Sequence, residues 1–252
     1  MANSRKKHNV VNLHPEVPQL TVQEMVKEIN RLKDEAFHFN YRIAKCLLRA
    51  LEFKDIYTYE HSARVAYYSV KTGEELGLGQ KDLTKLELAS FFHDIGKMGI
   101  PDSILLKPAR LEEAEFHLMK SHPEKSYQIL LEFCEEGGGA SADFQEIALA
   151  ARHHHERYDG RGYPCGLKGE AIPLFARIIL IADTFDAMTS NRPYRKGLPY
   201  EVAFSELREF SGDQFDKNLV ETFISAMGKD KSKGAAEFYL NIHPHPFKKE
   251  AA

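Results

Sequence analysis

The chain has 252 residues, of which 43% are hydrophobic, and its formal net charge is -3. This length suffices for one large domain, or for one ordinary domain with flanking segments, and the apolar content excludes wholesale disorder. The weak negative charge argues against a nucleic-acid polymer as partner, because such partners need clustered positive charge. Three cysteines, Cys46, Cys134 and Cys165, form no Cys-x-x-Cys pair, which favours unpaired thiols in a reducing compartment.

No segment has the character of a signal peptide or of a membrane span. The N-terminal MANSRKKHNV is positively charged, but no apolar stretch follows it. The densest apolar run, IILIA at residues 178–182, is far too short to cross a bilayer. We therefore expect a cytoplasmic protein without a membrane span.

Residues 1–20 are predicted to form a flexible tail, and residues 21–54 a long amphipathic helix. In the second segment apolar residues recur every three or four positions from Val22 to Ala50, as in a coiled-coil seam. Two interpretations fit this seam. The helix either lies on its own domain or forms a parallel dimer, which would make the protein a homodimer.

Helical patterns continue through the rest of the chain, and β-patterned runs are scarce. The apolar periodicity predicts helices at residues 58–76, 80–94, 123–134, 143–156 and 175–188. The segment EEGGGASAD, residues 135–143, is interpreted as a flexible linker, because it lacks the basic residue and hydroxyl of a phosphate-binding loop. We expect an all-α fold with its main domain at 55–228 and a C-terminal tail at 229–252.

Helix geometry predicts which members of the triplet HHH, residues 153–155, point inward. Successive residues advance by about 100° around a helix, and the buried stripe that leads into the triplet ends at Ala151. On this phase His154 and His155 flank the stripe, whereas His153 lies on the opposite side. Two inward imidazoles are enough to bind a metal, and His153 is expected to point outward.

Other candidate ligands lie on the inner faces of further helices. His93 and Asp94 end an apolar helix in FFHDIGKMGIP, and His122 precedes Pro123 near the start of the next. Asp183 interrupts the apolar stripe of ARIILIADTFDAMTS, where a carboxylate is costly to bury unless a positive group pairs with it. Seven inward residues thus form a predicted metal site: His61, His93, Asp94, His122, His154, His155 and Asp183.

Four blocks of the sequence resemble the HD-GYP domain, a branch of the HD phosphohydrolase superfamily. They are HDIGKMGIPDSILLKPARL, SHPEKSYQIL, HHERYDGRGYPCGLKGEAIPLFARIILIADTFDAMTSNRPYRKG and FSGDQFDKNLVETF, and they occur in the family's order. The resemblance extends from Asp55 to Met227. It implies an all-α HD-type helical bundle and phosphodiesterase activity. The substrate that it implies is cyclic di-GMP, a bacterial second messenger in signal transduction.

The resemblance also assigns roles to individual residues. It implies one divalent metal bound by His61, His93, Asp94 and Asp183. It implies a second metal bound by His122, His154 and His155, with Asp94 as the bridge. The GYP motif is Gly162, Tyr163 and Pro164. Some members of the family bind a third metal through a glutamate one turn before the first histidine, where this chain has Tyr57.

The predicted ligands agree with hydrolytic metal chemistry. Imidazole and carboxylate without thiolate suit iron, manganese or another first-row ion. Two such ions lower the pKa of a bridging water and take up charge as a P–O bond breaks.

Cys165 stands alone in the GYP loop and is interpreted as a spectator. Family members pair with diguanylate cyclases (GGDEF proteins) through this loop, which implies such a partner here.

Positive and aromatic side chains near the predicted site suit a substrate with two phosphates. Lys97, one turn after His93, is expected to contact a phosphate oxygen or the leaving group. Lys97 and Asp94 are the predicted catalytic residues. Arginines attract the phosphates and tyrosines stack on purines. Glu156 and Asp186 are expected to orient the histidines or the loop. The predicted substrate contacts are Lys97, Tyr163, Asp186, Arg192, Tyr194 and Arg195.

The sequence is compatible with three functions. The first is a cyclic di-GMP phosphodiesterase that releases linear pGpG and, on further cleavage, GMP. The second is an HD hydrolase of another nucleotide or cyclic dinucleotide. The third is a catalytically silent signalling module that binds cyclic di-GMP, although the retention of all seven ligands and of Lys97 counts against it.

Overall fold

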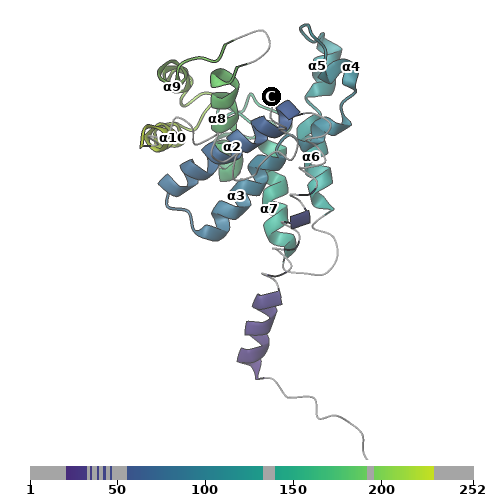
Figure 1. Cartoon of the computed structure of the whole chain (residues 1–252), viewed down its shortest axis with the longest axis vertical. Helices are drawn as coiled ribbons and strands as arrows, with labels where there is room; N and C mark the ends of the chain where they lie inside the picture. The colour runs from purple at the N-terminus through teal and green to yellow at the C-terminus, as the bar shows by residue number, and fades with distance from the viewer. Residues whose placement is uncertain are drawn as a thin grey trace, which may run out of the picture.

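The structure is a computed structural model of the chain (Figure 1). It describes residues 21–32, 56–132, 140–191 and 196–229, together with isolated positions between 35 and 46. Within these ranges the protein is helical, with one isolated β-bridge and no strand, so the all-α prediction is confirmed. The predicted N-terminal tail, and the C-terminal tail beyond Lys229, lie outside the described residues.

The predicted helices are present, with ends displaced by at most a few residues. They are α2 (Ile56–Glu75), α3 (Gln80–Phe92), α6 (His122–Leu131), α7 (Ala140–His153) and α8 (Leu174–Thr189). The start of α7 at Ala140 corrects the predicted linker, whose last four residues are helical. Apolar periodicity did not predict the remaining helices, which are α4 (Asp102–Leu105), α5 (Glu113–Met119), α9 (Tyr200–Glu209), α10 (Lys217–Lys229) and the short 3-10 helices η1 (Ile95–Gly99) and η2 (Gly169–Ala171).

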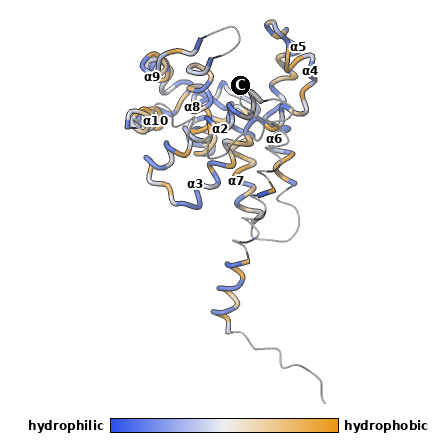
Figure 2. The backbone as a smooth tube through the Cα atoms, in the orientation of Figure 1, coloured by the Kyte–Doolittle hydropathy of each residue, from blue (hydrophilic) through white to orange (hydrophobic). Residues whose placement is uncertain are grey.

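Helix α8 lies at the centre of the bundle. Its side chains are apolar around most of its circumference, so other helices have to cover it on several sides. Ile178, Ile179, Ile181 and Phe185 are fully buried, and each such side chain contributes about 1.5–3 kcal/mol by leaving water. Helices α2, α7 and α9 pack around α8, while α3 and α10 pack on α2. Figure 2 shows apolar and polar residues alternating along the bundle helices. Among the described helices, none has both the length and the apolar character needed to cross a membrane.

A close backbone contact joins η1 to the start of α6. A Cβ built on Gly96 would lie 2.0 Å from the carbonyl oxygen of His122 and 2.5 Å from the amide nitrogen of Ser126. The Ser126 hydroxyl accepts the Gly96 N–H at 2.8 Å and donates to the His93 carbonyl at 2.8 Å. Since Asp94 lies between His93 and Gly96, this contact holds its carboxylate beside His122.

We expect Gly96→Ala to destabilise the domain, because a methyl group does not fit between the two backbone segments. Overpacking of this kind costs about 1–3 kcal/mol. Gly228→Ala on α10 is the matched control, since its Cβ would meet nothing within 4 Å and alanine is the better helix former by roughly 1 kcal/mol. Urea unfolding followed by circular dichroism measures both variants. A Gly96→Ala protein as stable as the control would contradict the contact.

The predicted N-terminal helix is described only in part. Residues 22–32 form a continuous helix, and the other positions described up to Cys46 are helical. The rest of the predicted extent to residue 54 lies outside the described residues. Val22 is 75% exposed, and Ile29 and Leu32 are each 51% exposed. In Figure 1 the helix stands apart from the bundle, so the interpretation that this seam packs on its own domain is wrong at these positions.

The dimer helix stays a prediction, and it has a direct test. Replacing Ile29 and Leu32 together with lysine should yield monomers in analytical ultracentrifugation, because two charges would enter the apolar seam. The metal content of the bundle should stay unchanged. A wild-type chain that is already monomeric at high concentration would end the idea.

Candidate metal centre

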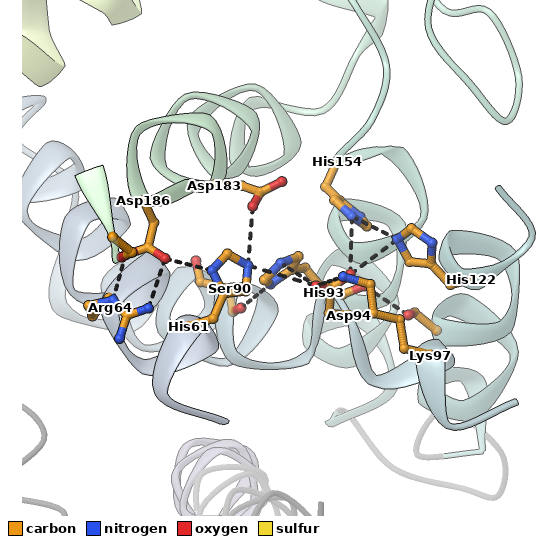
Figure 3. Close-up of polar contacts among 12 residues, drawn as sticks. His61, Arg64, Ser90, His93, Asp94, Lys97, His122, His154, Asp183 and Asp186 are labelled. Carbon is orange, nitrogen blue, oxygen red and sulfur yellow. Dashed lines mark hydrogen bonds and ion pairs between the residues drawn. The ribbon is translucent and has the colours of Figure 1, made fainter. Parts of the chain in front are cut away.

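Two clusters of imidazole and carboxylate groups meet at Asp94, just beyond the end of α3 (Figure 3). One cluster is His61, His93 and Asp94; the other is Asp94, His122, His154 and His155. In each cluster one ligand atom per residue lies within 4.8 Å of the others. Asp183 on α8 adjoins the first cluster, because its Oδ1 lies 3.1 Å from Nε2 of His61. The structure therefore brings all seven predicted ligands together.

Hydrogen bonds on the far side of the rings leave the inward nitrogens with a lone pair. Three histidines donate Nδ1–H to the carbonyl oxygen three residues earlier, at 2.6 Å for His93, 2.8 Å for His122 and 2.7 Å for His154. His61 donates its Nδ1–H to Oδ2 of Asp186 at 2.7 Å. A carbonyl or carboxylate oxygen only accepts here, so the proton is on Nδ1 and Nε2 is available to a metal.

Several of the inward atoms lack a hydrogen-bond partner. Nε2 of His93 and Oδ1 of Asp94 are buried and, among the described residues, have none. Nε2 of His122 approaches Asp94 Oδ1 to 3.1 Å without hydrogen-bond geometry. It also lies 3.4 Å from Nε2 of His154, which carries no proton because that ring donates through Nδ1. Nε2 of His155 is 3.2 Å away on another side and can donate to it. Buried lone pairs that face one another are unfavourable unless a cation lies among them, so these residues fit a divalent metal.

The protonation states of the ligands also suit a metal. Burial lowers the pKa of His154 well below its usual range and that of His155 to about 3, so both rings are neutral. Burial by itself would raise the pKa of Asp94, but the nearby Lys97 is among the groups that lower it well below its ordinary value. Neighbouring imidazoles lower the pKa of Asp183 in the same way. A metal ligand has to be deprotonated at the atom that binds the ion. The two neutral imidazoles and the two ionised carboxylates meet this condition.

Asp186 holds His61 from behind and is itself held by Arg64. Its carboxylate accepts from Nε of Arg64 at 2.6 Å and from the terminal nitrogen at 3.1 Å. The residue is 1% exposed, so its predicted contact with the substrate is wrong, because His61 and Arg64 occupy its oxygens. Against the effect of burial, Asp183 and Asp186 raise the pKa of His61 to about 9. The surroundings of His61 thus favour a positive charge, and a metal ion at Nε2 would take the place of the proton that this nitrogen otherwise holds.

His153 does not point into solvent as predicted. It is 6% exposed, and its Nδ1 lies 3.6 Å from Oε1 of Glu156. Because α7 ends at His153, the helical phase does not extend to His154 and His155, which reach the site from the turn that follows. The GYP loop covers the face of α7 that was expected to be exposed, and it brings Cys165 within 4.8 Å of His153 and Glu156.

The GYP motif folds back against the chain that leaves α7. A Cβ on Gly162 would lie 2.4 Å from Cα of Glu156, so only glycine permits the approach. The ring of Tyr163 stacks on His155, with centroids 4.8 Å apart and planes at 27°. Glu156 accepts the backbone N–H of Cys165 at 2.6 Å and of Leu167 at 3.0 Å. These contacts place the loop directly beside the metal ligands.

Of the other residues predicted from the sequence, Lys97 lies at the site, whereas four belong to segments or side chains that the structure does not describe. Nζ of Lys97 lies 2.5 Å from Oδ2 of Asp94, at the edge of the clusters. Sequence reasoning missed Arg64, although its spacing of three from His61 puts both residues on one helix face. Outside the described residues or side chains lie Tyr57, Arg192, Tyr194 and Arg195.

The sequence profile of the HD domain family matches residues 45–219. The chain belongs to this family. A curated relative of this HD domain, a cyclic di-GMP phosphodiesterase of Thermotoga maritima, is 40% identical over 186 residues, which are 74% of this chain and 49% of that protein. The 3'3'-cGAMP-specific phosphodiesterase 3 of Vibrio cholerae is 37% identical over 169 residues, 66% of this chain and 35% of that protein. The chain thus spans half or less of these relatives.

Solved structures agree with the helical architecture. The solved structure of Bd1817, a HDG"Y"P protein from Bdellovibrio bacteriovorus, matches with a TM-score of 0.52 and 18% identity, over 81% of this chain and 64% of that one. At this identity the match supports the fold alone.

We expect Asp186→Asn to weaken metal binding about 10–100-fold, as is usual for groups that orient a ligating histidine. The amide removes the negative charge that favours a cation at His61. Glu221→Gln is the control, because this carboxylate pairs with Arg208 on the exposed surface. Equilibrium dialysis with metal analysis measures the affinities, and circular dichroism verifies the fold. Equal metal binding in the two variants would contradict the role of Asp186.

Proposed function

We propose that this HD domain is a metal-dependent phosphodiesterase that hydrolyses cyclic di-GMP to linear pGpG and, on further cleavage, to GMP. One observation carries the proposal: the two oxygens of Asp94 face different clusters. Oδ1 lies near Nε2 of His122 and His154, whereas Oδ2 lies near Nε2 of His61 and His93. A carboxylate shared in this way suits a pair of divalent ions. The relative named as a cyclic di-GMP phosphodiesterase supports the choice of substrate.

The donor set supports iron or manganese as the two ions, because the ligands are imidazoles and carboxylates without thiolate. When bound by these residues, the two ions would supply a water of lowered pKa and positive charge for the phosphoryl oxygens. Tyr57 stands where a glutamate would serve a third metal, which favours two ions over three.

The chain's own residues would position the substrate around this centre. Lys97, whose amino group lies beside Asp94 at the edge of the clusters, is proposed to donate to a phosphate oxygen or to the leaving oxygen. Tyr163 is proposed to stack on a guanine base, since aromatic rings bind bases through their faces. Arg192 and Arg195 are predicted to bind the second phosphate, and Tyr194, which lies between them in the sequence, is predicted to stack on a base.

A second candidate function is hydrolysis of 3'3'-cGAMP, which the name of the V. cholerae relative supports. The two substrates differ in one base and share both phosphates. The metal ligands and Lys97 would therefore serve either of them, and base contacts would decide between them.

The proposal includes a cytoplasmic location, where cyclic dinucleotides act. It also includes a diguanylate cyclase (GGDEF) protein as a partner of the GYP loop. Arg161, Pro164 and Cys165 are exposed on this loop, which makes it accessible to another protein.

Protein loaded with iron or manganese under anaerobic conditions should convert cyclic di-GMP to pGpG, measured by chromatography. His122→Ala should lower turnover by more than about 100-fold, because even residues that only orient ligands account for 10–100-fold. His117→Ala, an exposed histidine of α5, is the matched control and should keep wild-type turnover.

The same assay separates the alternatives. Cleavage of 3'3'-cGAMP without cleavage of cyclic di-GMP would select the second candidate. Binding of cyclic di-GMP by loaded protein without release of product would contradict the enzyme and favour a signalling module.

A further inference from the structure

We propose that a separate metal site lies between the end of α7 and the GYP loop, and that it takes a thiolate-binding divalent ion of the zinc type. Its ligands are His153, Glu156 and Cys165, whose ligand atoms lie within 4.8 Å of one another. None of the three belongs to the clusters around Asp94. The site therefore stands whether or not the proposed hydrolysis does.

The imidazole of His153 has a buried nitrogen that is available to a metal ion. The residue is 6% exposed, and its Nδ1 is buried without a hydrogen-bond partner among the described residues. The nearest carboxylate oxygen, Oε1 of Glu156, is 3.6 Å away, which is too far for a hydrogen bond. A buried nitrogen without a partner is unfavourable, and a cation between it and the carboxylate would satisfy both.

The carboxylate of Glu156 is buried and has no cationic side chain of lysine or arginine beside it in the part of the chain that the structure describes. It is 1% exposed and accepts one backbone N–H on each oxygen, from Cys165 and from Leu167. Each carboxylate oxygen keeps a further lone pair for a metal. Among the described residues no lysine or arginine pairs with it, and its one ionic neighbour within 4.0 Å is His153. A negative charge buried in this way favours a cation.

Cys165 completes the set from the loop. The hydrogen bond from its own backbone N–H to Glu156 fixes the residue next to the other two ligands. Its side chain is exposed and forms no disulfide, so it can rotate towards them and water can take a fourth position. On binding, the thiol loses its proton to solvent and the thiolate bonds to the metal. In this proposal Cys165, which the sequence alone led us to interpret as a spectator, is a metal ligand.

The distances and the ligand types select the ion. Bonds of about 2.0–2.3 Å in a tetrahedral site place ligand atoms roughly 3.3–3.8 Å apart, and the 3.6 Å between His153 and Glu156 meets this range. One thiolate, one imidazole and one carboxylate suit zinc or cobalt(II) better than the oxygen-rich sites of magnesium or calcium. Such an ion would tie the GYP loop to α7, one residue before His154, and so hold Tyr163 on His155.

Cobalt(II) titration tests the site, because a cobalt–thiolate bond gives a near-ultraviolet charge-transfer absorption. The clusters around Asp94 contain no cysteine and cannot contribute to this band. Wild-type protein whose centre around Asp94 is already loaded with manganese should develop the band with one further equivalent of cobalt per chain, and zinc should displace it. Cys165→Ser should abolish the band, whereas the double variant with serine at Cys46 and Cys134 should retain it. His153→Ala should weaken cobalt binding at this site about tenfold or more.

Two results would overturn the proposal: a wild-type protein without the band, and a band that persists in Cys165→Ser. Circular dichroism verifies that each variant folds, and His153→Gln replaces His153→Ala if the latter does not. Asp94→Ala should keep the thiolate band while losing hydrolysis of cyclic di-GMP. Failure of this site and failure of the proposed function are therefore read from different signals.

Discussion

The buried carboxylate of Asp94 is the charge on which the rest of the site depends. It lies 3% exposed among the helices, where an uncompensated ion would cost several kcal/mol. Lys97 offsets part of this cost, and a metal ion between the carboxylate and the surrounding imidazoles would offset the rest. The close approach of Gly96 to α6 is what holds the carboxylate beside His122.

The histidines are aimed by the ends of helices. The last carbonyl groups of a helix have no partner within it, and these are the groups that three of the rings use. Ser90 lies in the last turn of α3, Met119 ends α5 and Ala151 lies in the last turn of α7. Each carbonyl accepts Nδ1–H from the histidine three residues later. One hydrogen bond thus satisfies the helix end and turns Nε2 towards Asp94.

The GYP loop connects this centre to a second set of polar groups. On one side Tyr163 stacks on His155, and on the other Cys165 approaches His153 and Glu156. Glu156 accepts the backbone N–H groups of Cys165 and Leu167, so this carboxylate fixes the part of the loop that lies next to His153. The proposed zinc-type site and the centre around Asp94 would share this loop while differing in ligand chemistry.

The sequence by itself determined the helical class and the main helices, because apolar periodicity is a local property. It also named the seven candidate ligands, but the helical phase used for His154 and His155 does not apply to them, because α7 ends at His153. Tertiary structure decided the orientation of the groups that no local rule reaches. His153 is buried because α7 ends there and a loop from further along the chain covers it. Asp186 holds His61 across 125 residues because α8 packs on α2. Periodicity assigns a residue to one face of its own helix, whereas the packing of other segments decides what that face meets.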